Sequence, residues 1–229
     1  DFVVEAATER VEIKRDIFAR LEDRVAPDAI LASNSSHLEP EVIFADVKKP
    51  GRGLVVHYFF PAERNPLVEV VPGKGTDRAV SDFCMKFYEA IGKVPLRVGS
   101  RYGYAVDPIF EGLFQAAALL VEQGVASPKQ VDAIAGKVLG LGVGPFTAMN
   151  LTGGNPITKV GLDDYREKIM PWFRAPALLD RQLAAKAPWE DAGRGETVTW
   201  DDGMFVKVSQ ALTGAYFGIV TEVLDSVIT

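Results

Sequence analysis

Residues 55–71 read VVHYFFPAERNPLVEVV, two apolar runs joined by a short loop that contains Pro61 and Pro66. The loop is too short for a crossover helix, so the two runs are expected to pair side by side in one sheet. Each run carries one ionisable residue, His57 in the first and Glu69 in the second. Burying Glu69 is costly without a partner, and the imidazole of His57 is the nearest one. A histidine held by a glutamate is what a general base requires. The simpler alternative is that Glu69 faces solvent on an edge strand and His57 is a satisfied strand-end histidine.

The residues around this pair of runs alternate between short apolar stretches and amphipathic ones. Strands are expected at 2–4, 30–33 and 94–98, and helices at 8–26, 39–45 and 77–91, with Thr8 as the N-cap of the first helix. This β-α-β alternation is typical of a parallel sheet. A polar loop, residues 34–37, follows the second strand directly. Ligands of open α/β sheets bind at such strand ends, so this loop is a candidate binding element.

The pattern changes near residue 99, beyond which no strand is expected. Helical periodicity covers 108–124 and 128–138, a further helix begins within 142–146, and others are expected at 169–186 and 205–227. The sequence therefore predicts an α/β part, residues 1–99, and an all-helical part, residues 100–229. The glycines between 140 and 154 follow no strand, which favours turns and close helix packing over a phosphate-binding loop.

The composition excludes several classes of function. The chain is 48% apolar and 24% charged, and its net charge of −6 argues against a nucleic-acid or anionic-membrane surface. No apolar run is long enough to span a membrane. One cysteine, Cys84, and two histidines make a disulfide framework or a zinc site improbable, so no metal is expected. Cys84 lies in a helical pattern, which favours a packing role. A single cysteine is typical of a reducing compartment, and no signal peptide is seen at the start, so a cytoplasmic location is expected. The chain begins within a strand pattern and ends within a helical one, as a piece of a longer chain would.

Several segments, in their order and spacing, resemble the L-3-hydroxyacyl-CoA dehydrogenase family. They are ASNSS at 32–36, HYFFP at 57–61 and PLVEV at 66–70, together with VVEA at 3–6 and GPF at 144–146. The resemblance implies an α/β Rossmann-type half domain, the second half of an NAD-binding domain, followed by an all-α C-terminal domain. The helical domain would shape the acyl-CoA site and form a homodimer. The implied reaction is the NAD-dependent oxidation of a 3-hydroxyacyl-CoA to a 3-ketoacyl-CoA, of the fatty-acid β-oxidation type.

The resemblance also implies roles for individual residues. His57 would take the hydroxyl proton, Glu69 would orient His57, and Ser36 would hydrogen-bond the reacting oxygen. Asp107 occupies the position of the family's catalytic-site asparagine. The cofactor side would be formed by residues at the ends of the first two strands and in the first helix: Ala6, Glu9, Lys14 and Ser36.

Three departures from the family pattern leave alternatives open. No G-x-G-x-x-G follows a strand, Phe60 replaces one family asparagine, and Asp107 replaces another. An ionised aspartate accepts hydrogen bonds but donates none, so it opposes a developing oxyanion. Asp107-Pro108 is also explained as a helix N-cap followed by proline. The rivals are a dehydrogenase with a changed hydroxyacid or acyl-CoA substrate, and a non-catalytic acyl-CoA-binding or dimerisation module. Residues 200–229 loosely resemble the start of a second helical copy.

Overall fold

The structure is a computed structural model and describes residues 1–59, 62–151, 155–185 and 189. The chain divides into two compact units, Asp1–Ile109 and a second that begins at Phe110. Three sequence features lie outside the described residues: Phe60, the helix expected at 205–227 and the possible second copy at 200–229.

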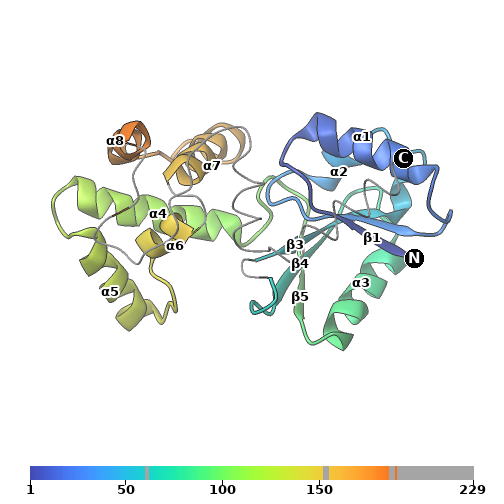
Figure 1. The fold of residues 1–229 in the computed structure, drawn as a ribbon, viewed down its shortest axis with the longest axis horizontal. Coiled ribbons are helices and arrows are strands. Elements are labelled where there is room, and N and C mark those ends of the chain that lie inside the picture. The colour runs from blue at the N-terminus through green and yellow to red at the C-terminus, as the bar shows by residue number, and fades with distance from the viewer. Residues whose placement is uncertain (60–61, 152–154, 186–188, 190–229) are drawn as a thin grey trace. The chain divides into compact units, whose positions relative to one another are not determined.

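The first unit is built on a five-stranded sheet (Figure 1). Its strands occur in chain order: β1 (Phe2–Glu5), β2 (Ile30–Ser33), β3 (Gly53–Tyr58), β4 (Leu67–Pro72) and β5 (Val94–Arg97). The first three strands are parallel, β4 is antiparallel to β3, and β5 is parallel to β4. The predicted pairing of the two apolar runs is confirmed, and it places His57 directly opposite Glu69.

Helices cover both faces of this sheet. They are α1 (Val11–Glu22), α2 (Pro40–Ile43) and α3 (Arg78–Ala90), with the 3-10 turn η1 (Pro50–Arg52) before β3. One buried cluster joins Phe18 of α1 and Ile43 of α2 to Val55 of β3, and the opposite one joins Tyr88 of α3 to Val56 of β3. Because both faces are buried, β3 reads as a continuous apolar run instead of an alternating one.

Cys84 lies on α3 and faces the sheet, as the helical pattern predicted. It is a free cysteine with no exposed surface. Burial raises the pKa of its thiol to about 12, so the thiolate that would react is scarce at neutral pH. The packing interpretation of Cys84 is confirmed.

The start of α1 differs from the prediction. The helix begins at Val11 with Arg10 as its N-cap, because the Arg10 N–H donates to the Thr8 carbonyl and closes a turn before the helix. Thr8 as the N-cap was therefore wrong. The buried face of α1 contains Lys14 as well as Phe18 and Leu21, and Lys14 has no exposed surface.

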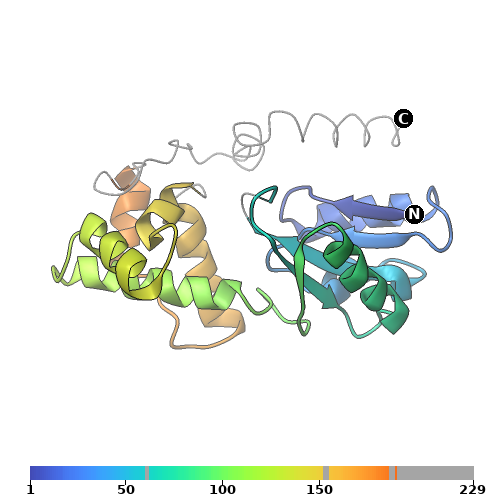
Figure 2. The same ribbon diagram turned by 90° about the horizontal axis from the view of Figure 1, so that it is seen from below.

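The second unit is helical (Figure 2). Its described helices are α4 (Asp107–Glu122), whose first residues belong to the first unit, α5 (Pro128–Leu139), α6 (Pro145–Leu151), α7 (Asn155–Lys168) and α8 (Ala177–Ala185). Ser127 and Gln130 form a capping box at α5. Asp132 of α5 caps the neighbouring α6, accepting N–H donors of Phe146 and Thr147 at 2.8 and 2.9 Å.

Two details of the helical part were wrong or missed. The helix expected from residue 169 begins only at Ala177, the first residue of α8, because Pro171 and Pro176 lie in the non-helical segment before it. Helix α7 was not predicted.

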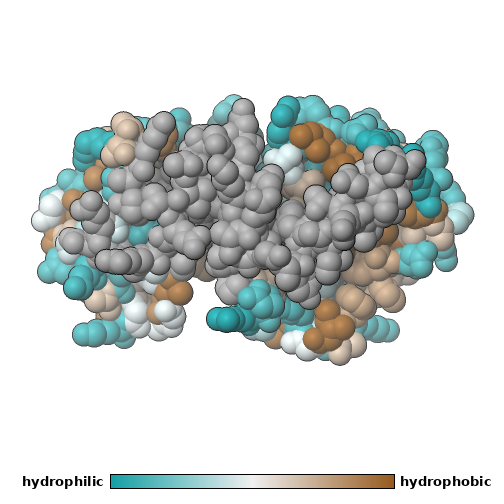
Figure 3. All heavy atoms as spheres, viewed as in Figure 1, coloured by the Kyte–Doolittle hydropathy of each residue, from teal (hydrophilic) through white to brown (hydrophobic). Residues whose placement is uncertain are grey.

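Within the described part of the chain, no helix combines the length and apolarity needed to cross a membrane. On the visible face of the first unit, hydrophobic residues form separate patches among hydrophilic ones (Figure 3).

Candidate active site

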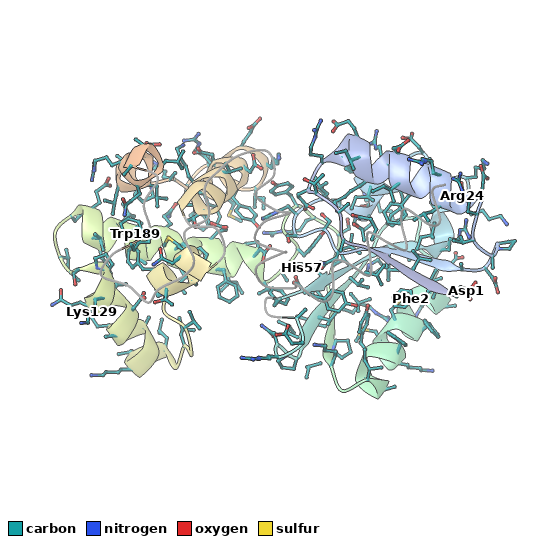
Figure 4. All side chains as sticks on the ribbon, viewed as in Figure 1. Asp1, Phe2, Arg24, His57, Lys129 and Trp189 are labelled. Carbon is teal, nitrogen blue, oxygen red and sulfur yellow. The ribbon has the colours of Figure 1, made fainter. Side chains whose placement is uncertain are left out.

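The centre of the site is the buried pair of His57 and Glu69. His57 lies near the carboxyl end of β3 (Figure 4), and its Nδ1 is 2.9 Å from Glu69 Oε2 on β4. His57 is 4% exposed and Glu69 is fully buried, which excludes the solvent-facing interpretation of Glu69. With Nδ1 donating to the carboxylate, Nε2 keeps its lone pair for a proton from a substrate.

Glu69 is fixed on its other side by the segment that leads into α4. Its Oε1 accepts the backbone N–H groups of Ala105 and Val106 at 3.1 and 3.0 Å. Tyr104, just before them, has a left-handed φ of 49° and is almost fully buried. Its hydroxyl donates to the Ser35 and Leu38 carbonyls, at 3.0 and 2.7 Å. This uncommon conformation in a large residue is held by those contacts, and such strain is frequent at functional sites.

Asp107, the first residue of α4, places a second carboxylate beside His57. Its Oδ2 lies 4.0 Å from His57 Nε2 and 3.7 Å from His37 Nε2. Burial raises the pKa of the Asp107 carboxyl, and the negative charges of Glu69 and Glu9 add to this, while the two imidazoles act in the opposite direction. The Asp107 side chain is 19% exposed. The carboxylate therefore belongs to the site as well as to the start of the helix.

Glu9 organises the polar loop that follows β2. Its Oε1 accepts the Ser35 hydroxyl at 2.5 Å and the backbone N–H groups of Ser36 and His37, each at 3.0 Å. Burial disfavours the Glu9 carboxylate, but the positive charge of Lys14 and these hydrogen bonds outweigh burial and hold its pKa below the ordinary value. Glu9 therefore ties the loop after β1 to the loop after β2.

Lys14 is a buried anchor beneath these loops. Its Nζ lies 2.9 Å from Glu5 Oε1, 3.5 Å from Glu9 Oε2 and 3.3 Å from the Ala7 carbonyl. Glu5, at the end of β1, also accepts the Ser33 hydroxyl at 2.6 Å. Because Lys14 has no exposed surface, it acts on any ligand through the loops that it holds.

The residues expected on the cofactor side fall at one edge of the sheet. Ala6 follows β1 and Ser36 follows β2, and these strands are parallel, so both loops lie at carboxyl ends. Such an edge is where dinucleotides bind in open α/β sheets. A nearby depression of about 390 Å³ is lined by Gly99, Ser100, Arg101, Tyr104 and Ala105. Among the described residues, no cluster of His, Cys, Asp or Glu side chains is arranged to hold a metal ion.

Two residues of this constellation were missed from the sequence. Glu5 ends β1 and shares Lys14, and His37 faces Asp107 from the loop after β2. His37 belongs to the polar loop 34–37, a candidate binding element of the sequence, but no role was predicted for its side chain. Its position in a polar loop at a strand's carboxyl end was the available signal.

Comparison with known proteins gives matches to two family descriptions. Residues 1–101 match 3-hydroxyacyl-CoA dehydrogenase, NAD binding domain, and residues 103–196 match 3-hydroxyacyl-CoA dehydrogenase, C-terminal domain. An L-carnitine dehydrogenase of Pseudomonas aeruginosa is 33% identical over 203 residues, covering 84% of this chain and 63% of that protein. The chain thus spans less than two thirds of that relative's length.

Two solved structures are similar to the chain. FadB2 of M. tuberculosis aligns with a TM-score of 0.76 and 32% identity, over 87% of this chain and 70% of that one. The (S)-3-hydroxybutyryl-CoA dehydrogenase PaaH1 of Ralstonia eutropha aligns with a TM-score of 0.77 and 25% identity, over 88% and 71%. The sheet, the helical unit and both matches define an NAD-binding dehydrogenase fold. The chain belongs to the 3-hydroxyacyl-CoA dehydrogenase family, which confirms the fold class and the resemblance expected from the sequence.

Proposed function

We propose that the protein is an NAD-dependent dehydrogenase that oxidises the 3-hydroxyl group of an acyl-CoA or a related acid. The observation that carries this proposal is the buried contact of 2.9 Å between His57 and Glu69. A fully buried carboxylate that holds an imidazole by Nδ1 leaves Nε2 as a general base. The proposed division of labour gives residues 1–99 to the cofactor side and 100–229 to the substrate and dimer contacts.

The residues would act on the substrate as follows. His57 Nε2 takes the proton of the 3-hydroxyl group, and Glu69 stabilises the positive charge that develops on the ring. Ser36 donates a hydrogen bond to the reacting oxygen and holds it toward His57. NAD held at the cofactor side would supply the acceptor for the hydride that leaves the carbinol carbon.

The cofactor side would consist of Ala6, Glu9, Lys14 and Ser36. Their fit to NAD is supported by two loops at the carboxyl ends of parallel strands, tied together by Glu9. Lys14 would position Glu9 from below. No G-x-G-x-x-G follows a strand in residues 1–229, so these residues would serve the nicotinamide side and not the pyrophosphate.

A second substrate class is favoured by Asp107. A carboxylate 4.0 Å from His57 Nε2 repels a developing oxyanion but attracts a cationic substituent near the reacting carbon. Carnitine carries a quaternary ammonium group one methylene away from its carbinol carbon, and a relative of this chain is named for that substrate. A cationic 3-hydroxy acid is therefore the alternative to a 3-hydroxyacyl-CoA.

The test uses the complete protein with two substrate pairs. NADH consumption is measured with acetoacetyl-CoA, and NAD reduction is measured with L-carnitine. His57→Gln should lower kcat by about 10²–10⁴-fold on the true substrate, since it removes the base. Glu69→Gln keeps a hydrogen-bonding group but loses the charge, and should lower kcat less.

Each outcome of this test has a distinct meaning. Activity with acetoacetyl-CoA alone supports the acyl-CoA substrate, and activity with carnitine alone supports the cationic acid. Full activity in His57→Gln contradicts the assigned base. If neither pair reacts although NADH binds, the substrate is a different one, and if NADH does not bind, the non-catalytic module is the better interpretation.

We further propose a homodimer formed by the helical unit and a cytoplasmic location. The dimer is supported by exposed apolar residues on α5, namely Ile134, Val138 and Leu139, which are 57%, 74% and 60% exposed. The location is supported by Cys84, a free thiol that suits a reducing compartment.

A further inference from the structure

A second histidine faces the candidate base across one carboxylate. Asp107 Oδ2 lies 3.7 Å from His37 Nε2 and 4.0 Å from His57 Nε2, so both rings present the same nitrogen to the same oxygen. Each distance is about 1 Å longer than a hydrogen bond. A small movement of the Asp107 carboxylate, which lies at the start of a helix, brings Oδ2 within hydrogen-bonding distance of one ring or the other. The three groups form a continuous row of proton acceptors.

His37 is held in this row by several contacts. Its backbone N–H donates to Glu9 Oε1 at 3.0 Å, and its carbonyl accepts the Gly103 N–H at 3.0 Å. Its ring stacks on Tyr102 with centroids 5.3 Å apart. The loop after β2 and the segment before α4 therefore fix the ring between them. The side chains of His37 and Asp107 are 21% and 19% exposed, against 5% for His57, so the row leads from the enclosed His57 to groups that meet solvent.

The proposed reaction creates a need for such a row. Each oxidation leaves the hydroxyl proton on His57 Nε2, and the next turnover requires that proton to leave. His57 is enclosed by Glu69, by Phe59 with ring centroids 4.5 Å away, and by Tyr104 at 5.6 Å. Asp107 presents an ionisable side chain to Nε2, with its Oδ2 4.0 Å away. Its carboxyl has a raised pKa, caused first by burial, so it takes up a proton more readily than an ordinary aspartate.

We propose that Asp107 and His37 form a proton path from His57 to solvent, and this inference rests on the proposed function. In the oxidation direction, the substrate hydroxyl gives its proton to His57 Nε2. Asp107 Oδ2 takes that proton and passes it to His37 Nε2, and His37 releases a proton to water. No electron moves along the path, and the two electrons of the reaction leave with the hydride. The reverse direction returns a proton by the same atoms. In this role His37 touches neither substrate nor cofactor.

Other charged groups near the row act on its ends. Glu9 Oε1 lies 4.0 Å from His37 Nδ1 and stabilises the protonated ring, while Lys14 beside Glu9 offsets part of that effect. Glu69 does the same for His57 at Nδ1. The carboxylates at both outer ends therefore allow either imidazole to carry the proton in turn.

The test compares two replacements of His37 in the complete protein. Gln places an amide nitrogen near the position of Nε2 but cannot transfer a proton, whereas Ala leaves a gap. Both variants should lose about 10-fold or more in kcat with little change in KM, because proton departure slows while substrate contacts remain. Added imidazole should restore much of the kcat that His37→Ala loses and should leave the kcat of the wild type unchanged. The solvent deuterium isotope effect on kcat should rise in both variants.

A readout without catalysis checks the same row. The imidazole NMR signals of His37 and His57 are recorded at one fixed pH. Asp107→Asn removes the carboxylate that lies beside both rings and should change the chemical shifts of both. Asp16→Asn, which removes an exposed carboxylate that bonds to Arg20 on α1, should move neither.

The outcomes separate this inference from the proposed function. Wild-type kcat in His37→Gln, or a His37→Ala variant that imidazole does not restore, overturns the path while His57→Gln still tests the base. Chemical shifts of the two rings that do not respond to Asp107→Asn also overturn it. If the wild type oxidises no 3-hydroxy substrate, the proposed function fails and the path loses its reaction, and the NMR signals then report only whether Asp107 joins the two rings.

Discussion

At the scale of the residue, Asp107 is a carboxylate kept at a cost to stability. Burial raises its pKa, so the folded protein holds the proton more tightly than the unfolded chain does. Stability linked to this group is therefore fully present below the unfolded pKa of about 3.9 and is lost as pH rises through the folded pKa. Residues retained against stability are typical of functional sites.

Asp107→Asn should therefore raise the free energy of unfolding at neutral pH. The amide has no charge to desolvate, and its advantage over wild type should shrink as pH falls toward the ordinary aspartate value of about 3.9. Urea unfolding of both proteins between pH 8 and pH 4.5 measures the difference. An Asn variant that is less stable than wild type at pH 8 contradicts this account.

Glu9→Gln is the matched comparison with the opposite sign. The pKa of Glu9 is lowered, because Lys14 and the hydrogen bonds outweigh burial, so its stabilisation is present at neutral pH and is lost as pH falls through the folded pKa. The Gln variant should lose about 1–3 kcal/mol at pH 7 and less at low pH. If the stability difference from wild type changes with pH in opposite directions in the two variants, then the Asp107 and Glu9 carboxylates have opposite effects on stability.

At the scale of the element, the site depends on the entry into β3. Gly53 begins this strand opposite Leu31 of β2, with an extended backbone that suits any residue. A Cβ at Gly53 would lie 2.8 Å from Cγ of Phe44, whose ring is packed in the core. Space, and not backbone conformation, therefore requires glycine here. The strand that carries His57 is fixed against α2 by this close approach.

Gly53→Ala should destabilise the protein by about 1–3 kcal/mol, because the Phe44 ring must move in a packed core. The measurement is the denaturant midpoint, together with kcat as a check on His57. Gly99→Ala is the control, since its Cβ would meet nothing within 4 Å. It should change stability by about 0.5 kcal/mol or less. Equal effects of the two substitutions would show that the contact with Phe44 is not the cause.

At the scale of the whole molecule, the proposed homodimer can be tested on α5. Ile134 and Val138 are one helical turn apart and exposed, while Val131 and Ala135 of the same helix are buried. Val138→Glu should convert a dimer to a monomer with little loss of monomer stability, because the residue is 74% exposed.

Light scattering after size exclusion measures the mass of each variant. Ala133→Glu places the same charge on another face of α5 and should leave the dimer intact. A monomeric wild type, or a Val138→Glu variant that stays dimeric, contradicts an interface on this face.

The sequence by itself predicted the β-α-β alternation, the pairing of the two apolar runs and the change to helices near residue 99, and it offered the pair of His57 and Glu69 as one of two interpretations. Hydrophobic periodicity and a short linker are local signals, and one linker of this length leaves one way to pair two strands. The start of the last described helix was predicted less well. Pro171 and Pro176 lie before α8, which begins at Ala177 and not near residue 169 as the apolar pattern suggested.

Only the tertiary structure decided what surrounds that pair. The resemblance placed Lys14 on the cofactor side but did not predict its burial, because Glu5 and Glu9, which pair it in the interior, come from other segments. His37 and His57 are 20 positions apart in the chain, and Asp107 is 50 positions beyond His57. Their approach depends on the left-handed turn at Tyr104 and on the packing of three elements. Contacts between side chains distant in sequence leave no periodic signal, so the row of ionisable groups appears only in the folded protein.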